Sequence, residues 1–185
     1  MINFEIFYAE IFPPRHRKFT QTISLWNTIF RMNRKKIMQI LTRTQGAYTL
    51  STDSQKLDIN TIHHFLAHDS YWARHIPRET VERAIKNSLN FGVYHGNSQV
   101  GYARIISDYA TIAYLGDVFI LPEHRGQALS KWLMESIKSH PQLQGLRRWI
   151  LLTADAHELY KAYGWTALAT PDRWMECHNP KVYQG

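Results

Sequence analysis

From Gly46 onwards, apolar residues recur at the three- and four-residue spacing of amphipathic helices in two long segments, residues 77–89 and residues 129–140. Pro77 opens the first segment and Pro141 stops the second, as expected for a residue that starts helices well and cannot continue them. Capping residues predict two shorter helices, residues 58–67 and residues 155–164 with Asp155 as N-cap and Gly164 as the C-terminal glycine.

Segments of strand-forming composition lie between these helices: residues 47–53, 91–107, 111–121 and 147–153. Gly96-Asn97 divides the second of them and indicates a β-hairpin. The tail also has strand-forming composition in "WTALA" and "WMECH". The order of elements predicts an α+β fold in which helices cover both faces of a mixed sheet.

Length and composition fit one soluble globular domain. The chain has 185 residues, of which 44% are hydrophobic and 20% charged. Its apolar runs are shorter than the roughly 18 residues that a membrane helix needs, and Glu5 and Glu10 interrupt the apolar N-terminal stretch that a signal peptide would require. The single Cys177 fits a reducing compartment. We therefore expect a cytoplasmic protein without a membrane segment.

The net charge of +7 is unevenly distributed. Residues 1–45 contain eight Lys or Arg against two acidic residues, whereas residues 46–185 are almost neutral. This division predicts a basic N-terminal extension (1–45) ahead of a domain (46–185). The extension is either peripheral or an arm for RNA or a membrane surface, and the neutral domain argues against a nucleic-acid partner.

The passage from strand to helix at residues 125–130 runs through small residues. Such a turn leaves backbone N–H groups unpaired at the helix N-terminus, where they and the helix dipole can bind a phosphate. Gly126 and Ala128 would let a ligand approach the backbone, and Arg125 and Lys131 add positive charge. An ordinary strand-to-helix turn is the alternative interpretation.

Residues 125–130 resemble the coenzyme A pyrophosphate loop of the GNAT superfamily of acyl-CoA N-acyltransferases, whose motif is Arg/Gln-x-x-Gly-x-Gly/Ala. Two positions depart from that pattern, since Ala128 stands where Gly is usual and Ser130 where Gly or Ala is usual. Alanine would be strained at position 128 in a conformation that only glycine adopts easily. A second block is similar to the family's Ala-x-x-Leu-Tyr-x-x-x-Gly-Phe, with its matches at Ala156, Leu159, Tyr160 and Gly164 and with Trp165 in the Phe position.

The resemblance covers roughly residues 46–170 and implies a GNAT-like fold whose mixed sheet is splayed at the coenzyme A site. It implies an N-acetyltransferase that moves the acetyl group of acetyl-CoA to a primary amine by direct attack in a ternary complex. Tyr160 would protonate the leaving thiolate, with a core aromatic as the alternative. Asp117 is the best-placed candidate base, and a capping or salt-bridged Asp is the alternative there. The coenzyme would contact Val118, Phe119, Ile120, Arg125, Gly126, Gln127, Ala128, Leu129 and Ser130.

Other residues support weaker hypotheses. Tyr71 and Trp72 would line an acceptor pocket or else pack in the core, and Tyr163 and His157 fit packing and a solvated helix face respectively. A pair of histidines four residues apart, His64 and His68, has metal-ligand spacing but lacks a third ligand in pattern, so we expect no metal.

Two further functions remain open from the sequence. One is a non-catalytic acyl-CoA sensor of the same fold, and retention of Tyr160 favours the enzyme over it. The other is an RNA-directed acetyltransferase that uses the basic N-terminal segment. The sequence does not identify the acceptor amine, and a homodimer is an open alternative to a monomer.

Overall fold

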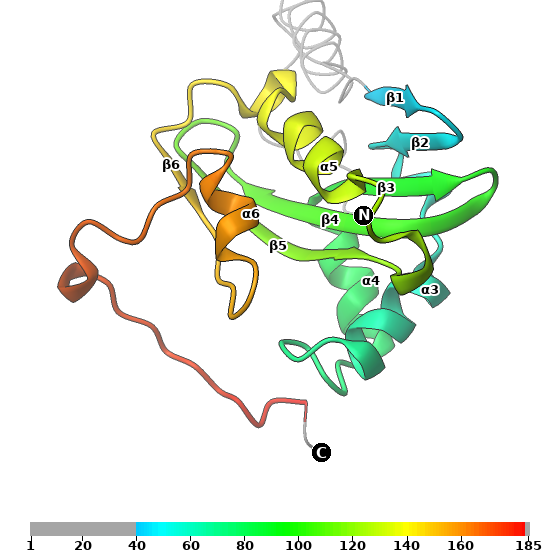
Figure 1. Cartoon of the computed structure of the whole chain (residues 1–185). Helices are drawn as coiled ribbons and strands as arrows, with labels where there is room; N and C mark the ends of the chain where they lie inside the picture. Colours follow the sequence, from blue (N-terminus) through cyan, green and yellow to red (C-terminus); the bar gives the residue numbers. More distant parts are fainter. Residues whose placement is uncertain (1–39, 184–185) are drawn as a thin grey trace, which may run out of the picture. The chain divides into compact units, whose positions relative to one another are not determined.

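A computed structural model describes residues 40–183, which belong to one compact unit (Figure 1). The basic extension up to residue 39 lies outside the described residues. The unit is built on a six-stranded sheet in the order β1-β2-β3-β4-β5-β6. The strands are β1 (Thr42–Gln45), β2 (Tyr48–Ser51), β3 (Leu89–His95), β4 (Ser98–Ser107), β5 (Ile112–Ile120) and β6 (Arg148–Ile150).

Neighbouring strands from β1 to β5 run antiparallel, and only β6 runs parallel to its neighbour β5. The β4–β5 register shifts between Tyr102 and Arg104, where the single residue Ala103 of β4 lies opposite Asp117 and Val118, which marks a bulge in the middle of β5. Bulges bend a strand and redirect its side chains. The mixed sheet that the sequence predicted is confirmed, together with the hairpin at Gly96.

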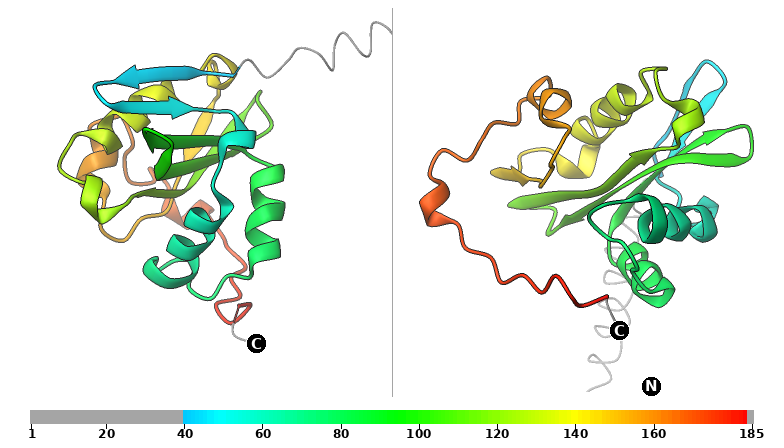
Figure 2. Two further views of the ribbon diagram at one scale, coloured as in Figure 1. Left: turned by 90° about the vertical axis from the view of Figure 1, so that its right-hand side faces the viewer. Right: turned by 60° about the horizontal axis from the view of Figure 1, so that its bottom comes forward.

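Helices cover both faces of the sheet, with α5 and α6 on one face and α3 and α4 on the other (Figures 1 and 2). Their bounds are α3 (Ile59–His64), α4 (Arg78–Lys86), α5 (Leu129–Lys138) and α6 (His157–Lys161). A π-helical turn, Phe65–Asp69, extends α3. Within residues 40–183, every helix is too short or too polar to cross a membrane.

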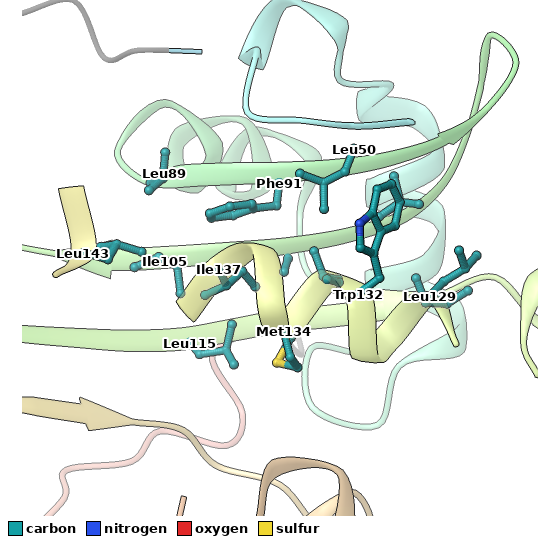
Figure 3. Close-up of a cluster of buried hydrophobic side chains, with 14 of the residues drawn as sticks. Leu50, Leu89, Phe91, Ile105, Leu115, Leu129, Trp132, Met134, Ile137 and Leu143 are labelled. Atoms are coloured by element: carbon teal, nitrogen blue, oxygen red, sulfur yellow. The ribbon is translucent and has the colours of Figure 1, made fainter. Parts of the chain in front are cut away.

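Each face of the sheet buries its own hydrophobic cluster. The α5 side includes Leu133, Met134 and Ile137, which are fully buried against β3, β4 and β5 (Figure 3). The other side joins α3, the π turn and α4 to Tyr102 and Phe119 of the sheet. Helix α5 therefore lies fixed across the sheet, and its N-terminus is positioned where β5 ends.

Strand β1 precedes residue 46, the start of the domain expected from the sequence. It pairs with β2 from Thr42 to Gln45. The guanidinium of Arg43 donates to the hydroxyls of Ser136 and Ser139 on α5, at 3.3 and 2.9 Å. The sheet thus begins at Thr42, and β1 is hydrogen-bonded to the C-terminal end of α5.

Two local expectations are wrong. The N-cap of α6 is Ala156, not Asp155, and α6 begins without a side-chain cap; the Ala156 N–H itself donates to the Thr153 hydroxyl at 3.0 Å. In addition, residues 166–183 contain no strand. Ring contacts hold this tail instead, since Trp165 lies against Trp149 and Trp174 under the Arg148 guanidinium.

Asp58 caps α3 as its sequence position suggested. Its carboxylate accepts the N–H groups of Asn60 and Thr61 and the Thr61 hydroxyl. The hydrogen bond from the Thr61 hydroxyl lowers the pKa of the Asp58 carboxyl most. Partial burial of Asp58 opposes it, the two backbone N–H groups add to it, and the pKa stays below its ordinary value.

We expect Asp58→Ala to lower the free energy of unfolding by about 1 kcal/mol, as for other lost N-caps. Because the folded-state pKa of Asp58 is depressed, its contribution is present above the unfolded pKa and disappears as pH falls through the folded one. Urea unfolding at pH 7 and at pH 3 measures both effects. Asp155→Ala, which removes no cap, is the control, and an equal loss in both variants would contradict the assignment.

Candidate active site

The outer edge of β5 is only partly covered by β6. The parallel pairing joins Ile112 to Arg148, Ala113 to Trp149 and Tyr114 to Ile150, and it ends there. Strand β5 continues to Ile120, still paired with β4 on its other side. The remaining edge of β5 therefore offers backbone groups to an extended ligand, as an unpaired strand edge does.

The alternation of strand N–H groups indicates which of them face this free edge. The N–H of Leu121 donates to Val100 of β4 at 2.8 Å. Successive N–H groups of an extended strand point to opposite sides, so that of Ile120 points away from β4. The segment expected to pair with the coenzyme arm lies on the free edge.

The turn that follows β5 leads into α5 without a side-chain cap. A short 3₁₀ turn, Pro122–His124, precedes it, and α5 begins at Leu129 directly after Ala128. The first backbone bond of the helix runs from Trp132 N–H to the Ala128 carbonyl, so the preceding N–H groups have no partner within the helix. Those donors and the helix dipole form a site suited to a phosphate.

Two residues of this turn have left-handed backbone conformations. Gly126 has a φ of +77°, and a Cβ built there would meet no atom within 4 Å. Ala128 has φ 59° and ψ 13°. This is the glycine-type conformation in which the sequence analysis expected alanine to be strained. Alanine can adopt it at a cost of about 1–2 kcal/mol. The structure keeps the glycine-type geometry of the turn although the glycine is absent.

The turn is tied to the sheet by side chains. The Nε of Arg125 donates to the Ile120 carbonyl at 3.0 Å. The Tyr48 hydroxyl donates to Gln127 Oε1 at 3.0 Å and lies 2.9 Å from His124 Nδ1. Sequence reasoning missed Tyr48, because it lies 79 residues from Gln127 and no spacing relates the two.

Asp117 occupies an irregular position on β5. Its φ is 54°, uncommon for a residue other than glycine, and it lies in the bulge of β5, opposite Ala103 of β4. Its Oδ2 forms an ion pair with Arg104 Nε, and its Oδ1 accepts the Trp72 indole N–H at 3.1 Å. Both charged side chains are largely buried, with exposed fractions of 18% for Arg104 and 12% for Asp117. The carboxylate is therefore oriented from two sides and its charge is balanced.

The gap that opens between β5 and the chain after β6, where their pairing ends at Tyr114, is called the fork. The loop between the π turn and α4 contacts both sides of it. Its Trp72 holds Asp117, and its Tyr71 hydroxyl accepts the N–H of Ala154, just after β6, at 2.9 Å. The two rings meet edge to face at 4.9 Å. Tyr71 and Trp72 are 56% and 41% exposed, so they are surface residues beside Asp117 and not core residues.

Tyr160 of α6 is buried to 8% exposure, and its ring packs against Trp165 at 5.8 Å. Burial, followed by the charges of Tyr71, Asp155 and Tyr114, raises the pKa of Tyr160 to about 12. Among residues 40–183 its hydroxyl has no hydrogen-bond partner. The phenol is thus protonated at neutral pH, with its proton free for a ligand.

Tyr114 is a further residue that the sequence did not single out. It is the last residue of β5 to pair with β6. Burial and the charge of Asp117 raise the pKa of Tyr114. The charge of Tyr114 in turn contributes to the raised pKa of Tyr160. Tyr114 therefore lies where the two strands separate, and it interacts electrostatically with both predicted catalytic residues.

The remaining candidates lie elsewhere. His64 and His68 have ring centroids 4.9 Å apart, on the face opposite α6. The part of the chain that the structure describes contains no group of three or more residues that could hold a metal ion. Tyr163 donates to Glu135 at 3.3 Å on the surface, and His157 is exposed at the start of α6.

A family model described as the Acetyltransferase (GNAT) family matches residues 59–165, and the chain belongs to this family. A candidate acetyltransferase of Gibberella zeae is 34% identical over 139 residues, which are 63% of this chain and 77% of the relative. The family match at residues 59–165 spans the free edge of β5, the turn and Tyr160.

Solved structures agree with this assignment. A candidate GNAT acetyltransferase from Xanthomonas campestris is 52% identical, with a TM-score of 0.73, and the match covers 75% of this chain and 97% of that one. A Clostridium acetobutylicum structure determined with acetyl-CoA is 15% identical, with a TM-score of 0.56 over 75% of this chain and 96% of that one, and shows the shared fold. The GNAT fold expected from the sequence is confirmed.

Gly126→Val should abolish coenzyme A binding. A β-branched residue is strained at this φ, and its side chain would occupy the space beside the helix N-terminus. Gly145→Val is the matched control, because Gly145 has a φ of +75° and equally open space but lies beyond the other end of α5. Calorimetry with coenzyme A should show binding to the control alone. Equal binding by both variants would move the phosphate site elsewhere.

Ala128→Gly should raise the free energy of unfolding by about 0.5–1 kcal/mol, because relief of the left-handed strain exceeds the entropy that glycine adds to the unfolded chain. Ala84→Gly, in the middle of α4, should instead lower it by about 1 kcal/mol. Urea unfolding of both variants gives the comparison. A destabilised Ala128→Gly variant would show that the backbone at this position is not left-handed.

Proposed function

We propose that the chain is an N-acetyltransferase that moves the acetyl group of acetyl-CoA to a primary amine by direct attack in a ternary complex. The observation that carries the proposal is the continuity of the free β5 edge with the uncapped N-terminus of α5. An extended pantetheine arm and a pyrophosphate require those two features in that order.

The chain's own groups supply what coenzyme binding needs. The backbone of Val118 to Ile120 would pair with the amides of the arm. Residues 126–130 would surround the pyrophosphate through backbone donors, with Arg125 holding the turn against β5.

The reaction transfers one acyl group and one net proton. The amine nitrogen attacks the thioester carbon, the C–S bond breaks, and the nitrogen releases a proton while the sulfur gains one. Asp117 is the candidate acceptor of the amine's proton, directly or through water. As a carboxylate it has further lone pairs beside those that Trp72 and Arg104 engage.

Tyr160 is the candidate acid for the departing thiolate. Its phenol is buried, protonated and without a partner among the described residues, which suits a group that must donate at one moment of the reaction. A pKa of about 12 lies above the ~8.5 of a thiol in water, but burial disfavours thiolate and phenolate alike. The burial that makes the Tyr160 phenol a weaker acid therefore also makes the departing thiolate a stronger base.

The direct test is thiol release from acetyl-CoA measured against a panel of small amines, amino acids and lysine peptides. Release that depends on one class of amine supports the proposal and names the acceptor. Tight binding of acetyl-CoA without turnover across the panel would favour the non-catalytic sensor. Failure to bind coenzyme A would reject both functions.

Tyr160→Phe should lower turnover at saturating acetyl-CoA by roughly 10²–10⁴-fold, the range for loss of general-acid catalysis. Coenzyme affinity should change little, because the pyrophosphate contacts lie in the turn. Tyr163→Phe, which removes a surface hydroxyl three residues away, is the control and should retain turnover. Wild-type turnover in Tyr160→Phe would leave Tyr160 a packing residue.

The pH profile gives an independent readout. The active form of Tyr160 is the protonated one, and burial raises its pKa to about 12. Ionisation of this phenol should therefore leave turnover unaffected up to about pH 10. An alkaline decrease that is centred near pH 10 in the wild type and absent from Tyr160→Phe would contradict the buried, protonated state.

A further inference from the structure

A cavity of about 340 Å³ lies between the end of α5, the start of β6 and the C-terminal tail. Its walls are the end of α5 at Lys138, the start of β6 at Arg148 and Trp149, residues 164–170, and Trp174. Arg148 and Trp149 are the β6 residues paired with Ile112 and Ala113, at the closed end of the β5–β6 ladder. The cavity is therefore separate from the free edge of β5.

Two cations stand over indole rings in this cavity. The ammonium of Lys138 lies 4.6 Å from the ring centroid of Trp149 and 4.8 Å from that of Trp165. The guanidinium carbon of Arg148 lies 5.0 Å from the ring centroid of Trp174. Among the described residues neither cation has an ion-pair partner.

The charge of Lys138 is incompletely compensated. Burial lowers the pKa of its amine, which indicates that the ammonium has lost hydration without gaining a carboxylate. The faces of the two indoles attract it, but they leave the cavity with a net positive charge. An anion entering the cavity would meet donors from both Lys138 and Arg148.

The remaining walls select for a flat apolar body. Three tryptophans line this small cavity, and the parts of their rings that the two cations leave uncovered offer apolar surface; the volume is at the lower end of the range for small-molecule sites. A cationic amine would be repelled, so the cavity does not suit the acceptor of the proposed reaction.

We propose that this cavity is a second ligand site, which binds a small organic anion with an aromatic face, such as an aromatic carboxylate. The carboxylate lies between Lys138 and Arg148, and the ring packs against the uncovered parts of the tryptophans. Bound ligand joins the tail, through residues 164–170 and Trp174, to α5 and β6. The site is independent of the acetyl-transfer chemistry.

Calorimetric titration of the full chain with 1-naphthoate tests the proposal, and the uncharged isostere 1-naphthamide tests the need for the anion. We expect the amide to bind at least tenfold more weakly. Lys138→Met and Arg148→Met should each weaken naphthoate binding about tenfold or more, since each removes a charge-assisted contact. Arg147→Met, at the exposed neighbouring residue outside the cavity, should bind as the wild type does.

Three results would overturn the proposal: no naphthoate binding at millimolar concentration, equal binding of acid and amide, or equal weakening by Arg147→Met. Displacement of naphthoate by coenzyme A would place the probe in the fork and would also overturn it. Lys138→Met keeps the aliphatic stem, and circular dichroism checks its fold. Arg148 is exposed, so its variant tests the same contact if Lys138→Met is unstable. None of these measurements depends on acetyltransferase activity.

Discussion

The pairing between β5 and β6 stops after three residue pairs, and the arrangement of the candidate site depends on that early separation. A fully paired β5 would have both edges satisfied and could not receive an extended ligand. Because β6 departs after Tyr114, the edge towards Ile120 stays available. The same strand delivers the chain to the N-terminus of α5, so one element provides the edge for an arm and leads to the site for its phosphates.

The position of α5 follows from packing and not from the turn. The side chains of Leu133, Met134 and Ile137 are fully buried between the helix and the sheet. At the C-terminal end of the helix, Arg43 of β1 donates hydrogen bonds to Ser136 and Ser139. A helix fixed along its length can leave its first N–H groups unpaired without fraying. The uncapped N-terminus is therefore a stable feature that remains open to an anion.

The sequence predicted those features that are encoded by neighbouring residues. Periodicity indicated α4 and α5, and the contiguous motif at residues 125–130 indicated the turn. Contacts between distant segments left no such signal: Arg104 with Asp117 depends on a bulge, and Tyr48 with Gln127 on the sheet order. The tail was predicted wrongly because strand-forming composition does not specify a partner strand.

Two residues on this path, Asp117 in the middle of β5 and Ala128 at the start of α5, have positive φ without being glycine. Such conformations persist only where surrounding contacts over-determine them. Asp117 is held by Arg104 from β4 and by Trp72 from the loop before α4, and Ala128 lies between the buried Leu129 and a turn tied down through Gln127. Strain is thus concentrated where the strand must redirect a carboxylate and where the backbone must turn its N–H groups outward. Neither purpose is served by a regular strand followed by a regular cap.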